Sequence, residues 1–461
     1  MVLTTAAAAT AAANAKYPPG PKRRLPGGQM FAFRRDPLKF LTHIAGEYGD
    51  VSRFRVGPQV FYFLNHPDLV RDVLVTHHER FHKGRALQRA KRLLGEGLLT
   101  SEGEHWQRQR RLAQPAFHRQ RLQGYGRVMV DYAERAAERW RDGEALDISE
   151  EMMRLTLSIV GKTLFDADVE HDASEVGGAL SEIMDLFGYL MFPFAELMEK
   201  VPILPPVRRF NRARARLDGV VYRIIDERRR GGEDRGDLLS MLLLAEDEEG
   251  DRTGMSNEQV RDEAMTLFLA GHETTANLLA WTWYLLSRNP EAERRLHAEI
   301  DAVLEDGRAP TVDDLPRLRY TEMVVSEVMR LYPPAWAVGR RAIADHEAGG
   351  YHVPANSLIL VSQYVAHRDP RFWPDPERFD PERWTAEARG QRPQFAYFPF
   401  GGGPRRCVGE AFAWMEATLI LATLASRWRM RLAPGSTVET SPRITLRPGR
   451  GGVPVTLERR R

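Results

Sequence analysis

The helical spacing of apolar residues over a long central stretch is the feature that most constrains the fold. From about Asp68 to Arg330, apolar residues recur at intervals of three and four, which is the period of an amphipathic helix. Alternating runs lie on either side, "VSRFRVGPQVFYFLN" before the stretch and "ITLRPGRGGVPVTLE" at the end of the chain, and each predicts a hairpin. The pattern predicts a mainly α protein with a small β-rich lobe.

Composition narrows the function classes. The chain has 461 residues, 43% hydrophobic and 28% charged, with a net charge of +3, so it is globular and carries no charge signature of a nucleic-acid-binding protein. A single cysteine cannot form an internal disulfide, which favours a reducing, cytoplasmic location. No apolar run approaches the roughly 18 residues of a membrane span. We therefore expect a monomer without a transmembrane anchor.

The first residues differ from the rest. "MVLTTAAAATAAANAK", residues 1–16, is rich in alanine but has no basic residue ahead of its apolar part, whereas a signal peptide needs one. This segment is predicted to be a disordered tail. With no repeat or linker further on, residues 17–461 are predicted to form a single domain with helical and β-rich lobes.

The only cysteine lies in "FPFGGGPRRCVG". It directly precedes an apolar helix predicted from about Val408 to Trp428, and unpaired amides and the helix dipole at such an N-terminus favour a thiolate. Arg405 and Arg406 add positive charge. Side chains are absent on both sides of the sulfur, which lets the backbone approach a large, flat group, at Gly401, Gly402, Gly403 and Gly409. These neighbours favour a ligand role for Cys407 over that of a small buried hydrophobic residue.

A second unusual pattern interrupts a long helix. Ser256 and Gln259 form a capping box ahead of one apolar stripe, made by Val260, Ala264, Leu267, Gly271, Thr274, Leu278, Trp281 and Leu285. Within it, "AGHETT" (270–275) places a glycine, an acid and two hydroxyls among apolar residues. Taken alone, Gly271 reads as a packing contact and Glu273 as a surface charge.

Together these segments resemble a known family. The pattern Phe-x-x-Gly-x-Arg-x-Cys-x-Gly is similar to the haem-binding loop of the cytochrome P450 superfamily, and its fixed positions are Phe400, Gly403, Arg405, Cys407 and Gly409. The resemblance implies the P450 fold, with haem b (iron protoporphyrin IX) between a long distal helix and the proximal helix after the cysteine loop. Cys407 would be the axial ligand, a thiolate that favours O–O cleavage, and Arg405 would pair with a propionate.

"AGHETT" is similar to the oxygen-binding segment of the same family. The resemblance implies that Ala270 and Gly271 leave room for dioxygen beside the helix backbone. Thr274 would anchor a water network to which Glu273 supplies protons. The acid–alcohol pair favours oxygen activation with external electrons. It disfavours a peroxide-driven or isomerising enzyme, and a haem-thiolate sensor that performs no chemistry.

Further segments support the resemblance. "GEGLLTSEGEHWQRQRRLAQPAFH" carries Trp106 and Arg110 four residues apart, and "LYPPAWAVG" precedes Arg340. Family resemblance implies that these three residues bind the haem propionates. The motifs occur along the chain in the same order as in the family. A helical scaffold without haem would leave their spacing unexplained.

"SEVMR" and "PERW" form another family pair. Glu327 and Arg330 lie three residues apart on one helix face, and Arg383 follows in the next segment. In the family this glutamate and two arginines brace the region that carries the ligand. We therefore expect a structural role for them.

The predicted activity is that of a haem-thiolate monooxygenase acting on a hydrophobic molecule. Electrons would come from a separate ferredoxin with its reductase, or from a flavoprotein. A basic patch could steer such a partner, formed by Arg108, Arg111, Arg119, Arg121 and Arg406. The motifs lie nearest to fatty-acid-hydroxylase-like branches, while terpenoids, steroids and polyketides stay open as substrates.

Two regions remain to be placed. The segment from the histidine cluster at residues 77–82 to Leu99 is predicted to form the roof and entrance of the substrate pocket, together with Phe187–Val207. For Phe187–Val207, a role at the pocket is favoured over a membrane contact. His77, His78 and His82 have no matched acid or cysteine in the sequence pattern, so they are predicted to be surface or pocket-rim histidines rather than a metal site.

Overall fold

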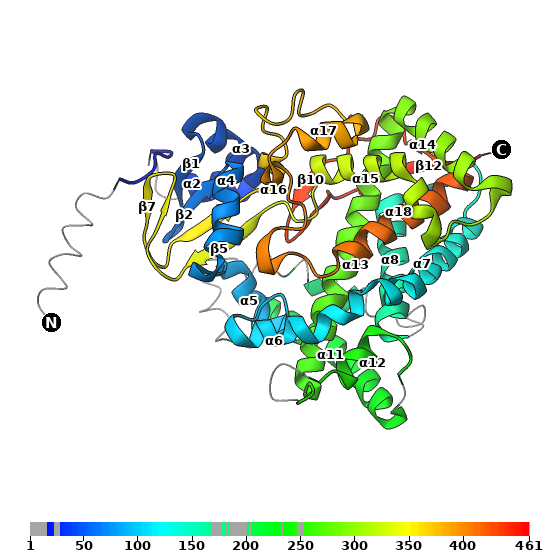
Figure 1. Cartoon of the computed structure of the whole chain (residues 1–461), viewed down its shortest axis with the longest axis horizontal. Coiled ribbons are helices and arrows are strands. Elements are labelled where there is room, and N and C mark those ends of the chain that lie inside the picture. The colour runs from blue at the N-terminus through cyan, green and yellow to red at the C-terminus, as the bar shows by residue number, and fades with distance from the viewer. Residues whose placement is uncertain are drawn as a thin grey trace, which may run out of the picture. The chain divides into compact units, whose positions relative to one another are not determined.

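A computed structural model describes residues 16–22, 28–166, 178–179, 182–183, 186, 201, 204–232, 234–246 and 253–460, with only the backbone at 119, 120, 165 and 306. The predicted tail, apart from Lys16, and most of Phe187–Val207 lie outside these residues. The chain folds into two compact units (Figure 1). A β-rich unit comprises residues 1–88, 336–376 and 392–406, and a helical unit comprises residues 89–335, 377–391 and 407–461.

The β-rich unit is built on a five-stranded sheet with the order β1-β2-β8-β5-β3. The strands are β1 (Val51–Val56), β2 (Gln59–Leu64), β3 (Phe81–Lys83), β5 (Val338–Ala342) and β8 (Leu358–Val361). β1 and β2 pair antiparallel around Gly57, whose φ of 61° suits the turn, so the first predicted hairpin is confirmed. β2 and β8 run parallel. A separate ribbon pairs β6 (His346–Ala348) with β7 (Tyr351–Val353).

Short helices cover this sheet. They are α2 (Gly28–Arg35), α3 (Pro37–Tyr48), α4 (Pro67–Arg71) and α16 (Gln363–Ala366). Leu41 and Ile44 of α3 pack against Phe54 and Phe63 of the sheet. α4 continues into a π-helical turn, Asp72–Thr76.

The helical unit contains most of the α-helices of the described residues. They are α6 (Gly103–Ala113), α7 (Arg119–Arg139), α8 (Ile148–Phe165), α11 (Pro205–Gly231), α12 (Leu238–Leu244), α13 (Asn257–Arg288), α14 (Pro290–Val303), α15 (Arg319–Leu331), α17 (Ala386–Gly390) and α18 (Glu410–Arg427), while α5 (Arg85–Leu94) begins in the β-rich unit. The predicted capping box of Ser256 and Gln259 starts α13. α13 contacts α8, α11, α15 and α18. It is therefore the central helix of this unit.

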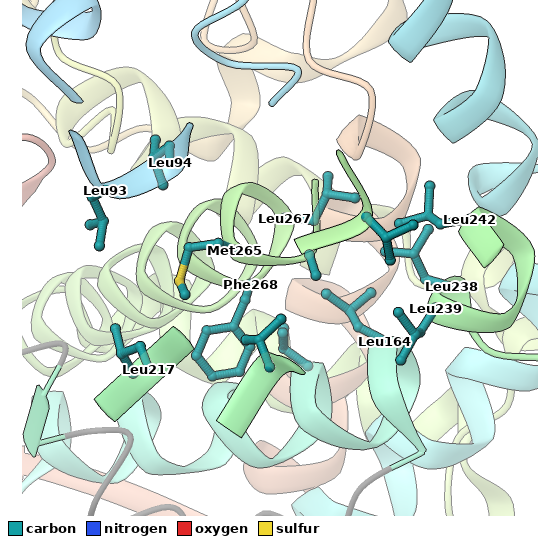
Figure 2. Packing of buried hydrophobic residues seen from close by; sticks show 14 of the residues in the cluster. Leu93, Leu94, Leu164, Leu217, Leu238, Leu239, Leu242, Met265, Leu267 and Phe268 are labelled. Atoms are coloured by element: carbon teal, nitrogen blue, oxygen red, sulfur yellow. The ribbon is translucent and has the colours of Figure 1, made fainter. Parts of the chain in front are cut away.

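Burial of α13 is wider than the single predicted stripe. Residues 260–268 and 275–286 are buried without interruption, because neighbouring helices cover several sides. Figure 2 shows Met265 and Phe268 of α13 in one apolar cluster with Leu217 of α11 and Leu164 of α8. Each such side chain contributes roughly 1.5–3 kcal/mol when fully buried. The cluster therefore holds α13 rigidly against its neighbours.

The strands of the helical unit correct the second predicted hairpin. β11 (Leu446–Pro448) pairs with β10 (Thr440–Pro442), while β12 (Pro454–Arg459) pairs with β4 (Ala145–Asp147) and β9 (Trp428–Leu432). β11 is held on α13 because the Trp281 Nε1 donates to the Leu446 carbonyl at 3.1 Å. β12 instead buries its apolar face beside β9. Two adjacent strand patterns thus belong to two sheets.

Candidate active site

Cys407 lies three residues before α18, which begins at Glu410 with Gly409 as its N-cap. Its side chain is exposed, and the free amides and dipole of the helix N-terminus favour its thiolate. Burial lowers the pKa of Arg110, and the negative charge of Cys407 opposes that shift. The guanidinium therefore lies close enough to the sulfur to interact with it. Trp106, one turn earlier on α6, is buried.

Residues 400–406 of the loop belong to the β-rich unit. Two glycines among them are required by packing contacts that the sequence did not predict. Gly403 has a φ of +66°, and a Cβ there would lie 2.0 Å from the Leu74 carbonyl oxygen. A Cβ on Gly402 would lie 2.5 Å from the Phe395 ring. Both glycines are thus required by packing within their own unit, whereas Gly401 faces open space.

The β-rich unit also contains the predicted haem-binding residues Phe400, Arg405 and Arg340. Arg405 ends a 3-10 turn, Gly403–Arg405, and is half-buried, as is Phe400. Arg340 is buried in β5, where its Nη1 donates to the Gly339 carbonyl at 3.1 Å. Each of these residues has further interactions.

Burial along α13 is broken at one place. Ala270 is exposed and Gly271 and Thr274 are half-buried, although the helix is buried before and after them. The Thr274 hydroxyl donates to the Ala270 carbonyl at 2.8 Å. A Cβ on Gly271 would lie 3.2 Å from Val160 of α8, so this glycine serves helix packing. The open surface is therefore provided by Ala270 and Thr274.

Glu273 is not a surface charge. Its carboxylate is 6% exposed and accepts a hydrogen bond from the Thr445 hydroxyl at 2.6 Å. The Asn277 amide also donates to that hydroxyl, at 3.2 Å. Burial raises the pKa of Glu273, while Thr445 and the charge of Arg447 oppose the shift. Glu273 is thus a buried acid with a raised pKa, held from the β10–β11 region rather than by its neighbour Thr274.

Thr445 escaped the sequence reading because it lies 172 residues from Glu273 and belongs to no motif. Further buried acids were also missed. Burial raises the pKa of Glu416 on α18 to about 8, and the nearby Thr275 hydroxyl opposes that shift only in part. An acid inside the apolar run "AFAWMEATLILATL" was the available signal.

Two more acids of α13 hold the segment after α5. The Glu96 amide donates to Asp262 at 2.7 Å, and the Leu98 amide donates to Glu263 at 3.0 Å. Burial raises the pKa of Glu263 to about 8. A Cβ on Gly97 would lie 2.4 Å from the Thr266 hydroxyl oxygen. The segment is therefore fastened to the same helix that carries Ala270.

The predicted group of Glu327, Arg330 and Arg383 is confirmed. Glu327 binds the Nε and Nη2 of Arg330, both at 2.8 Å, and its Oε1 lies 3.4 Å from the Nε of Arg383. The Trp384 Nε1 and the Asp380 amide also donate to Glu327, each at 2.9 Å. One carboxylate thus fastens the segment around residue 380 to α15.

Two expectations about surface residues change. Arg108 donates to the Thr253 carbonyl at 2.8 Å, and Arg121 forms an ion pair with Asp234, so two members of the predicted basic patch have partners within the helical unit. The side chain of Arg119 lies outside the described residues.

The histidine interpretation is also corrected. His77 does have a matched acid, because its Nδ1 lies 2.5 Å from Asp72. The acid was missed because a spacing of five residues does not bring two side chains together on an α-helix.

An exposed cysteine before a helix N-terminus and an accessible patch on a buried helix agree with the haem-thiolate family that the motifs resemble. The chain belongs to the cytochrome P450 family, because the family model "Cytochrome P450" matches residues 18–454. Among solved structures, the crystal structure of the cytochrome P450DA haem domain is similar, with a TM-score of 0.88 and 27% identity over 97% of this chain and 98% of that chain. The mainly helical fold is thereby confirmed.

Characterised relatives include two proteins of Streptomyces melanosporofaciens. Cyclooctatin synthase is 42% identical over 92% of both chains, and cyclooctat-9-en-7-ol 5-monooxygenase is 43% identical over 89% of both. Pentalenene oxygenase of Streptomyces avermitilis is 37% identical over 89% of this chain and 90% of its own. The chain is thus a P450 monooxygenase. In the part of the chain that the structure describes, no helix could cross a membrane.

Haem b is the cofactor of this family, and the residues fit it. Cys407 presents an accessible sulfur, and it is the only thiol in the chain. Ala270 and Thr274 interrupt an otherwise buried helix. An exposed alanine in the middle of such a helix is unusual in a protein interior, and it is explained by a group that the chain itself does not supply.

Proposed function

We propose that the chain hydroxylates a terpenoid, with dioxygen as oxidant and a separate ferredoxin or flavoprotein as electron donor. The accessible patch of Ala270 and Thr274, beside the buried acid Glu273, is the observation that carries the proposal. Terpenoid chemistry is supported by the cyclooctatin and pentalenene enzymes among the relatives. For fatty acids the support is likeness of motifs alone.

The overall reaction requires two electrons and two protons. One oxygen atom enters a C–H bond as hydroxyl and the other leaves as water, so two protons must reach the oxygen atom that becomes water. When bound, haem supplies oxygen activation and C–H oxidation. The residues of the chain bind that group, orient it, and deliver the protons.

The motif residues of the family would bind the haem. Cys407 would hold the iron, and the propionates would be bound by cationic and indole groups, namely Trp106, Arg110, Arg340 and Arg405. Charge-assisted hydrogen bonds from arginine to carboxylate are strong and directional. The interaction of Arg110 with the sulfur charge supports its part in this set.

Proton delivery falls to the helix. Ala270 leaves space, and the Thr274 hydroxyl, which donates to the Ala270 carbonyl, can accept a hydrogen bond from a water at its oxygen. Glu273, with its raised pKa, holds a proton at neutral pH more readily than an exposed carboxyl does. The pair thus fits general acid catalysis.

Apolar packing supports a hydrophobic substrate. Leu267 and Phe268 lie three and two residues before Ala270 and belong to the buried apolar cluster (Figure 2). A hydrocarbon skeleton placed beside them would lose its contact with water, which is favourable by roughly 25 cal/mol per Å².

The first experiment separates the haem-thiolate assignment from the substrate. The reduced wild type with carbon monoxide should show a strongly red-shifted Soret band, and Cys407→Ala should lose it. A wild-type band at the position typical of histidine ligation would contradict the ligand assignment. With the ligand established, product analysis with a terpenoid panel and a fatty-acid panel decides the substrate, and oxidation of fatty acids alone would overturn the terpenoid proposal.

A further inference from the structure

Three side chains of the β-rich unit form a cluster of metal-ligand type that has no part in the chemistry above. Asp72, His77 and His346 each offer one ligand atom, and these atoms all lie within 4.8 Å of one another. The Asp72 carboxylate joins the two rings, with one oxygen 2.5 Å from the His77 Nδ1 and the other 2.7 Å from the His346 Nε2. The ring centroids are 5.3 Å apart.

The backbone is specially shaped to bring two of them together. In an α-helix of about 3.6 residues per turn, side chains five apart point in different directions. Residues 72–76 instead form a π-helical turn, closed by a hydrogen bond of 2.8 Å from the His77 amide to the Asp72 carbonyl. Such turns are rare and occur frequently at functional sites. Here the turn places a carboxylate and an imidazole on one side of the chain.

The third side chain comes from a distant segment. His346 starts β6, and its ring is 4% exposed. The Phe81 ring packs against it edge-on at 5.0 Å, which holds the imidazole plane. Asp72 and His77 are 23% and 41% exposed, so an ion could reach the cluster from the His77 side.

We propose that Asp72, His77 and His346 form a zinc-binding site. Two imidazoles and one carboxylate with a fourth position for water is a set that suits Zn²⁺. Zinc bonds of about 2.0–2.1 Å require the carboxylate to leave its bridging position between the rings and the ligand atoms to separate slightly. Hard ions such as Mg²⁺ prefer all-oxygen sites and are not expected to bind.

One feature limits the affinity. The His346 Nδ1 is buried and has no hydrogen-bond partner, whereas a metal-binding imidazole usually donates its second N–H to an acceptor. Zinc on the Nε2 places a proton on this nitrogen. We therefore expect binding in the micromolar range, weaker than at structural zinc sites with four protein ligands.

The competing interpretation is a carboxylate that only braces two histidines by hydrogen bonds. Both interpretations predict a loss of stability when the cluster is mutated, so stability alone cannot separate them. Zinc binding can separate the two interpretations, because a carboxylate that only forms hydrogen bonds to two histidines is not expected to bind the ion.

The test uses tag-free, haem-loaded full-length protein treated with a chelator. Zn²⁺ is titrated in competition with a chromophoric chelator, and zinc K-edge absorption, which does not detect the haem iron, reports the ligands. We expect one ion per chain in the wild type, with nitrogen and oxygen ligands only. His77→Gln and Asp72→Asn should each weaken binding at least tenfold.

His78→Gln is the matched control, since the His78 Nδ1 lies 2.9 Å from the Val75 carbonyl and outside the cluster. Its affinity should equal that of the wild type. Because His77 is partly exposed, His77→Gln should fold even if Asp72→Asn does not. Wild-type protein that binds no zinc at micromolar concentrations, or that binds it as tightly as His77→Gln, would overturn the proposal.

Discussion

Two sets of buried carboxylates in the helical unit have opposite surroundings. Glu327 is 0% exposed, yet two arginines, an indole N–H and a backbone amide surround it. Glu273 is nearly as buried, but a threonine hydroxyl is its hydrogen-bond donor, and no arginine or lysine of the described residues forms an ion pair with it. The charge of the Glu327 carboxylate is balanced by its partners. Burial instead raises the pKa of Glu273, which favours the neutral, protonated form of that carboxyl.

The difference separates structure from chemistry. A fully paired buried charge is costly to disturb, so the Glu327 group suits a brace that does not change during turnover. A buried acid that forms no ion pair within the described residues can gain and lose a proton. Glu416 and Glu263, whose pKa burial raises to about 8, belong with Glu273. Their positions on α18 and α13 place titratable groups along the two helices that carry the predicted site.

Glu327→Gln should produce the largest loss of stability. It leaves Arg330 buried without its counter-charge, which costs about 3–5 kcal/mol. Urea denaturation monitored by circular dichroism measures the loss. Glu291→Gln is the matched control, because Glu291 and Arg294 have the same spacing but are 69% and 68% exposed, and exposed pairs contribute about 0–1 kcal/mol. Equal losses of stability in the two variants would show that the buried Glu327 group contributes no more than an exposed ion pair.

Unlike Glu327→Gln, Glu273→Gln should change the stability little and the turnover rate strongly. The amide fills the same space and still accepts from Thr445, but it cannot release a proton. General acid–base catalysis contributes about 10²–10⁴-fold, so turnover should fall by that order while electrons are still consumed. Product formed per electron pair measures the effect. Glu258→Gln, at an exposed position in the first turn of α13, should behave as wild type, and full coupling in Glu273→Gln would remove the assigned role.

Glu416→Gln tests the raised pKa itself. Below about pH 4.5 the carboxyl is protonated in both the folded and the unfolded chain. Between about 4.5 and about 8 it ionises only when unfolded, so stability falls as pH rises through that window and levels off above it. Gln removes this contribution, a difference in slope of up to about 1.4 kcal/mol per pH unit.

The measurement is the free energy of unfolding from urea denaturation at several values between about pH 5 and about pH 9. Glu138→Gln, an exposed position on α7, supplies the control and should follow the wild-type curve. A Glu416→Gln curve parallel to that of wild type would show that this carboxyl ionises in the folded state as it does in water.

Local motifs could be predicted from the sequence, but the partners that side chains meet from distant parts of the chain could not. The capping box of Ser256 and the helix after Cys407 follow from short local patterns. The group around Glu327 follows from the order of the family motifs, because its spacing alone recurs at Glu291 and Arg294. Thr445 could not be predicted as the partner of Glu273, because its selection depends on how β11 packs on α13. The cluster at His77 was missed for a different reason, since a π-helical turn has no periodicity signal of its own.

Thr445→Val should give the smallest effect, and it tests the hydrogen bond from Thr445 to Glu273 directly. It removes the hydroxyl that stabilises the ionised form of Glu273, a hydrogen bond worth about 0.5–1.5 kcal/mol, so turnover should fall by up to about tenfold. Since the hydroxyl opposes the rise of the Glu273 pKa, its loss should move the limb of the pH–rate profile that reports this acid toward higher pH. Thr445→Ser keeps the hydroxyl and should restore both values. If Ser and Val behave alike, the threonine methyl group rather than the hydrogen bond matters, and Glu273 would be set by burial alone.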